Sequence, residues 1–121
     1  MARLFFLCGT LLAGLSVIMG AWAAHSDVFD EVQSLWIDKG VRYQMFHALA
    51  LICTSLVLAN HKKSSIFAVL AGCCFLGGTV LFSGSLYFMA VSSVDAGYIT
   101  PAGGMLFLLG WILLALTGPG K

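Results

Sequence analysis

The order of hydrophobic and polar residues divides the chain into long apolar stretches separated by short polar ones. Residues 4–24, 66–91 and 101–117 carry no charged side chain, and residues 41–60 carry only Arg42. A helix needs about 20 residues to cross a bilayer. The pattern therefore predicts four membrane spans, over residues 4–24, 41–60, 66–91 and 101–117. Thr100 and Pro101 are typical of a helix start and mark the beginning of the fourth span.

The polar segment after the first span has a helical pattern of its own. Its apolar residues fall at spacings that form one stripe of an α-helix, namely Val28, Phe29, Val32, Leu35 and Trp36. Ser26 or Asp27 is a suitable cap for its start. The pattern predicts a short amphipathic helix over residues 27–38 that lies on the membrane surface. The expected fold class is an all-α membrane protein, a four-transmembrane-helix bundle with this interfacial helix, in a single domain over residues 1–121.

Composition supports a bilayer as the solvent and excludes several classes of function. The chain of 121 residues is 60% hydrophobic and 9% charged, against about 25% charged in soluble domains. A net charge of +1 with scattered basic residues argues against binding of nucleic acid. The four cysteines lie in apolar surroundings without a CxxC pair, which favours buried thiols over a disulfide framework or a zinc site.

The first span has a second interpretation, and the basic residues predict an orientation. Arg3, the apolar core and Ala21-Trp22-Ala23 also resemble a secretory signal with its cleavage site, but the later spans keep the protein in the membrane in either case. Arg3, Lys62, Lys63 and Lys121 fall on one side, which predicts cytoplasmic termini in the inner membrane of a bacterium. Lys39 and Arg42 oppose this bias locally.

Polar side chains within the spans are concentrated at one depth. Counted from the outer face, Gln44 and His47 lie roughly 5 and 9 Å deep, and Tyr87, Ser85 and Ser83 roughly 6, 9 and 12 Å deep. His25 and Thr100 stand at the same end, whereas the inner half shows almost no polar residue. Ser83 and Tyr87 share a helix face and Ser85 points elsewhere. The candidate site residues are His25, Tyr43, Gln44, His47, Ser83, Ser85, Tyr87 and Thr100.

These residues allow two interpretations. Buried polar groups that hydrogen-bond across helices hold a bundle together. Alternatively, an ionisable residue within the membrane marks a functional site, which predicts a small pocket for a ligand or a lipid headgroup. His25 and His47 lack a third metal ligand, so no metal and no cofactor is expected. No carboxylate is available to orient a serine–histidine pair, so serine catalysis is not expected.

Four blocks of the sequence resemble one protein family. They are Met19–His25, Tyr43–Ala50, Gly78–Tyr87 and Thr100–Trp111, which are similar to the family motifs GAFGAH, YQxxHxLA, GxxxFSGSLY and TPxGGxxFxxGW. The family is the domain-of-unknown-function 423 family, also described as transmembrane-protein-256-like. Trp22-Ala23 replaces its usual Phe-Gly. The resemblance implies a small integral membrane protein of the bacterial inner membrane. It does not imply any particular activity.

The expected function is that of a non-enzymatic membrane protein. It would hold a small ligand or lipid headgroup in the outer third of the bundle, or act as an accessory subunit of a membrane complex. The alternatives are a small transporter or channel protomer, which would need to oligomerise because the chain is short, and an enzyme that uses His47 on lipids. Membrane lipids and further copies or subunits are the expected partners, and glycine-rich faces on the first and third spans are suited to such contacts.

Overall fold

The computed structural model describes residues 1–61 and 65–119, and this part of the chain forms four α-helices. The helices are α1 (Ala2–Ala24), α2 (Glu31–Asn60), α3 (Ile66–Ser92) and α4 (Ile99–Thr117). Each is long and apolar enough to cross a membrane. The predicted four-helix membrane fold is therefore confirmed. The basic residues Lys62, Lys63 and Lys121, used above to predict orientation, lie outside the described residues.

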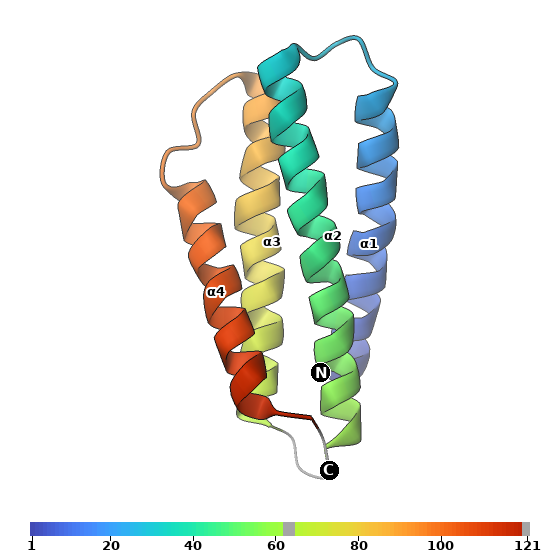
Figure 1. Ribbon diagram of the computed structural model, residues 1–121, viewed down its shortest axis with the longest axis vertical. Helices are drawn as coiled ribbons and strands as arrows, with labels where there is room; N and C mark the ends of the chain where they lie inside the picture. Colours follow the sequence, from blue (N-terminus) through green and yellow to red (C-terminus); the bar gives the residue numbers. More distant parts are fainter. Residues whose placement is uncertain (62–64, 120–121) are drawn as a thin grey trace.

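The helices run alternately up and down and stand side by side in the order α1, α2, α3, α4 (Figure 1). Each helix packs against its neighbour in the sequence, and within the described residues α1 and α4 share no comparable interface. The central helices α2 and α3 bury 39% of the residues in their most apolar stretches, against 17% for α1 and α4. The two flanking helices therefore turn most of their surface toward the lipid.

The two ends of the bundle are named here by the chain. The distal end is where α1 joins α2 and α3 joins α4, and the terminal end is the opposite one, where the N-terminus lies (Figure 1). The apolar core lies between mid-membrane and the terminal end. It is built from all four helices and consists of Phe5, Ala50, Leu51, Ala71, Phe75 and Phe107.

The prediction of a separate surface helix over residues 27–38 is wrong. Residues 27–30 are not helical, and from Glu31 the chain forms the first turns of α2 without a break before Asn60. Asp30 starts this helix as its cap, in place of Ser26 or Asp27: its carboxylate accepts from the Gln33 amide, 2.8 Å away, and Gln33 Oε1 accepts from the Asp30 amide, 2.9 Å away. This reciprocal pair is a capping box.

Gly40 explains why α2 continues through the position where a break was expected. A Cβ at residue 40 would lie 2.8 Å from Cε1 of Tyr87, so the glycine makes room for that ring. Its carbonyl also accepts a hydrogen bond from Ser83. Gly40 is therefore a contact between α2 and α3 and not a helix end.

The other helix boundaries lie within two residues of the prediction. α4 begins at Ile99, with Tyr98 as its cap residue and without a capping side-chain hydrogen bond. Thr100 consequently lies inside the first turn and does not cap the helix. α3 ends at Ser92, and Ser93 closes it in the left-handed conformation (φ 57°).

Candidate functional site

Gln44 connects three helices near the distal end. Its Nε2 donates to the Leu12 carbonyl of α1 over 2.9 Å, and its Oε1 accepts from the Tyr87 hydroxyl of α3 over 2.7 Å. Because a carbonyl oxygen can only accept, the contact with Leu12 fixes which end of the amide faces α1. Gln44 is 2% exposed. Its side chain therefore uses one donor and one acceptor to bridge α1, α2 and α3 in a site closed to solvent.

Two serines extend the network to both neighbours of α3. Ser83 donates to the Gly40 carbonyl of α2 over 2.7 Å. Ser85 donates to the Phe82 carbonyl of its own helix over 2.9 Å and shares a second hydrogen bond with Thr100 of α4. As their spacing predicts, Ser83 and Tyr87 both bond to α2, while Ser85 faces α4. Ser83 and Tyr87 thus join α3 to α2, and Ser85 joins it to α4.

His47 completes the network on the side of α4. Its Nδ1 lies 2.7 Å from the Tyr43 carbonyl, and its Nε2 lies 3.1 Å from the indole Nε1 of Trp111. An indole N–H can only donate, so Nε2 accepts and Nδ1 carries the proton that bonds to Tyr43. The imidazole also stacks on Phe107, with ring centroids 3.5 Å apart and planes 7° apart. The geometry therefore selects the neutral imidazole with its proton on Nδ1.

The side chains of two candidate residues stand apart from this network. His25 is the exposed residue that ends α1, and no hydrogen bond of its side chain is found within the described residues. Tyr43 is 38% exposed and contributes its backbone carbonyl, while its ring packs on Phe82 with centroids 4.7 Å apart. The structure brings together Gln44, Tyr87, Ser83, Ser85, Thr100 and His47, but it leaves His25 at the surface.

The distal network is a set of four separate groups of hydrogen bonds, around Gln44, Ser83, Ser85 and His47. The hydroxyls of Ser83 and Ser85 bond to groups other than His47, so neither of these serines forms a pair with that histidine. No cluster of three metal-ligating side chains occurs in residues 1–61 and 65–119. The buried side chains of Gln44, His47, Ser83 and Ser85 all find partners on neighbouring turns or helices. Such an arrangement can hold helices in register, because every polar group replaces water with a protein partner.

Sequence reasoning missed three members of this network. Trp111 is not among the candidate residues, although a buried indole N–H usually has a hydrogen-bond partner and His47 is a suitable acceptor. The carbonyls of Leu12 and Gly40 belong to apolar or featureless positions, so no pattern of side chains points to them. The inner half also contains more buried hydroxyls than expected, on Thr54, Ser55 and Thr79, and each bonds to a carbonyl of its own helix.

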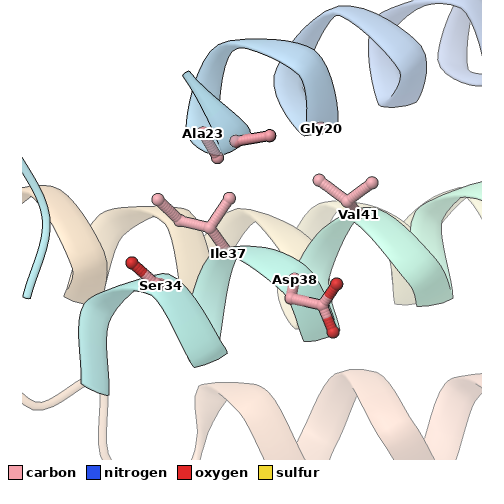
Figure 2. Close-up of a pocket in the computed structure, with 7 residues that line it drawn as sticks. Gly20, Ala23, Ser34, Ile37, Asp38 and Val41 are labelled. Atoms are coloured by element: carbon pink, nitrogen blue, oxygen red, sulfur yellow. The ribbon is translucent and has the colours of Figure 1, made fainter. Parts of the chain in front are cut away.

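Two hollows lie at the distal end, outside the network. One of about 190 Å³ separates the end of α1 from the start of α2, where the small residues Gly20 and Ala23 face Ile37 and Val41 (Figure 2). The other, of about 480 Å³, lies on α2 and is lined by residues between Val32 and Tyr43. Asp38 lines both hollows.

Comparison with known proteins gives one consistent result. The family model described as "Protein of unknown function (DUF423)" matches residues 19–104. A UPF0382 membrane protein of Staphylococcus epidermidis is 39% identical over 118 residues, which cover 94% of this chain and 93% of that protein. One of Haemophilus influenzae is 44% identical over 102 residues, 82% of this chain and 80% of that protein.

The name of a third relative states the membrane in which that protein is found. The UPF0382 inner membrane protein YgdD of Escherichia coli is 38% identical over 118 residues, which cover 94% of this chain and 88% of that protein. No solved structure matches the chain.

Proposed function

We propose that this chain, which belongs to the family described as "Protein of unknown function (DUF423)", is a non-enzymatic subunit of a larger inner-membrane assembly. In this proposal the hydrogen bonds in the interior have a structural role and hold the four helices together as one rigid unit. The contacts that matter for function would then be made at the surface. The open row of helices supports this, because α1 and α4 each leave a broad face without a protein neighbour in the described part of the chain.

The glycines of α1 carry the proposal. Gly9 packs tightly on α2, since a Cβ there would lie 2.8 Å from the Ala48 carbonyl oxygen. Gly14, five residues later in the same helix, is exposed and has nothing within 4 Å of the place a Cβ would occupy. An exposed glycine weakens a helix by about 1 kcal/mol relative to alanine. Its presence is accounted for if a second helix approaches closely there.

A shallow hollow surrounds Gly14 on the lipid-facing side of α1. Its volume is about 430 Å³, and it is lined by Thr10, Leu11, Gly14, Leu15 and Ile18. Thr10 and Gly14 are four residues apart, so two small residues lie one above the other on one helix face. The Thr10 hydroxyl is already bonded to the carbonyls of its own helix. The face is therefore apolar and carries small residues, which allow close approach of a second helix in a membrane.

A transporter or channel protomer has less support. Conduction needs polar groups along the whole path, and the buried hydroxyls of the inner half are bonded back to their own helices. The distal polar groups are likewise occupied by one another. A path between protomers would have to be lined by the exposed faces, which are apolar around Gly14.

Native mass spectrometry on protein extracted gently from its own membrane tests the proposal. We expect the wild-type chain to appear in a complex heavier than the monomer, and Gly14→Leu to release it as a monomer. Ala115→Leu, on the exposed face of α4, is the matched control and should leave the complex intact. A monomeric wild-type chain, or a complex that survives Gly14→Leu unchanged, would contradict the proposal. The mass of the complex distinguishes further copies of this chain from another protein.

A further inference from the structure

The larger distal hollow lies on a face of α2 that carries three charged side chains, Asp38, Lys39 and Arg42. Its lining combines two cations with two aromatic rings, in the set Trp36, Asp38, Lys39, Arg42 and Tyr43. Its volume is about 480 Å³. Arg42 forms an ion pair with Asp38 over 2.7 Å, and both side chains are largely exposed. Within the described residues Lys39 has no such partner, so the face has one positive charge in excess.

The level of this face in the bilayer follows from the length of α2. The helix has 30 residues, whereas about 20 residues, at 1.5 Å each, span the hydrocarbon core of about 30 Å. Counted back from Asn60, the core ends near Val41. Lys39 and Arg42 therefore stand where the hydrocarbon gives way to headgroups. Trp36 and Tyr43 suit the same level, because such rings gather at membrane interfaces.

The same side of α2 continues as an apolar surface deeper in the membrane. Phe46 follows Arg42 by four residues and Leu49 follows Phe46 by three, so all three lie along one helix face. Phe46 is 55% and Leu49 50% exposed. A cationic headgroup-level site followed by an exposed apolar strip matches the two parts of a phospholipid, its phosphate and its acyl chain.

We infer that this face of α2 binds an anionic phospholipid, with the phosphate at Lys39 and Arg42 and an acyl chain along Phe46 and Leu49. Charge complementarity selects the anionic class, since the face is positive by one charge. It also explains why two cations stand at the distal end, against the charge bias of the other basic residues. The inference is independent of the proposed assembly through α1, because the two surfaces belong to different helices.

Lipid titration by native mass spectrometry tests the site, with phosphatidylglycerol as the anionic probe and phosphatidylcholine as the zwitterionic one. Each cation near a headgroup is worth about 1 kcal/mol, which is about a fivefold change in affinity. We expect Lys39→Gln and Arg42→Gln each to weaken the first phosphatidylglycerol about fivefold. Arg3→Gln, an exposed cation at the other end of the bundle, is the matched control and should change nothing at this site.

A variant that is expected to strengthen lipid binding distinguishes loss of the site from a general loss of structure. Asp38→Asn removes the carboxylate that competes for Arg42, so it should strengthen phosphatidylglycerol binding while the two cation variants weaken it. Equal losses in Lys39→Gln, Arg42→Gln and Arg3→Gln would overturn the inference, because they would show unspecific attraction. It would also be overturned if phosphatidylcholine bound as tightly as phosphatidylglycerol. Competition by inorganic phosphate at matched concentration would assign the site to a free anion and not to a lipid.

Discussion

The distal third of this bundle has hydrogen bonds between helices, which the described residues of the terminal half lack, whereas packing of aromatic rings on glycines occurs in both regions. In the distal third, side chains bond across helices, as Gln44 does to α1 and α3 and as Ser83 does to α2. In the terminal half, aromatic rings fill the spaces left by glycines, as the Phe5 ring does against Gly72, and buried hydroxyls bond only to their own helix. The difference separates two ways of fixing helices in lipid, by hydrogen bonds between helices and by close packing.

The difference follows the chemistry of the two regions. Apolar packing is weakly selective in a membrane, because lipid chains are as apolar as the side chains that they compete with. Close approach at a glycine gives that packing its selectivity. A hydrogen bond between helices supplies selectivity by another route, since it leaves an unpaired group when the partner shifts. The distal network and the terminal glycine contacts therefore perform one task in two ways.

Changing a tightly packed glycine should have the largest effect and tests the terminal half. Gly9→Ala would place a Cβ 2.8 Å from the Ala48 carbonyl oxygen, so α1 and α2 have to separate. We expect a loss of about 2 kcal/mol in the free energy of unfolding. Gly14→Ala, in open space on the same helix, is the control and should not destabilise the monomer. Equal effects of the two changes, measured by unfolding in bicelles, would show that packing at Gly9 is unimportant.

Removing a serine that bonds between helices should have a smaller effect and sharpens the contrast. Ser83→Ala leaves the Gly40 contact of α2 unmade, and we expect a loss of about 1 kcal/mol in the free energy of unfolding. Thr79→Val removes a hydroxyl that bonds within α3, to the Phe75 carbonyl. We expect a loss of only about 0.5 kcal/mol, because the Phe75 carbonyl keeps its backbone partner within the helix. If Thr79→Val proves as costly as Ser83→Ala, bonding between helices is not what distinguishes the distal third.

The smallest effect is expected where the network meets the lipid. Trp111 is 47% exposed and donates to His47, so Trp111→Phe keeps a ring and loses one hydrogen bond. Hydrogen bonds between membrane helices average about 0.6 kcal/mol, which is the loss that we expect here. Trp22→Phe, at the exposed end of α1, serves as the control. The same loss of stability in both variants would show that the hydrogen bond between Trp111 and His47 does not stabilise the fold.

Much of the fold could be predicted from the sequence, because the length and spacing of apolar stretches determine the spans. The start of α2 was predicted ten residues too late, because the charged stretch before it was assigned to a separate surface helix. Asp30 and Gln33 were a visible signal of the true start.

Less of the site could be predicted. Depth along the spans correctly gathers Gln44 with Tyr87, but depth alone does not tell which helix each side chain faces. The rotation of the helices directs Gln44 toward α1 and His47 toward α4, and it leaves His25 at the surface. The carbonyls of Leu12 and Gly40 are invisible in a sequence, because every residue carries one.

The double-mutant cycle of Gln44→Met and Tyr87→Phe tests the claim that the distal network holds the helices together. Both changes keep the size of the side chain and remove one partner of the 2.7 Å hydrogen bond. Measured by unfolding in bicelles, the coupling free energy should be about 0.6 to 1.7 kcal/mol. A coupling indistinguishable from zero, with both single variants as stable as the wild type, would contradict the account.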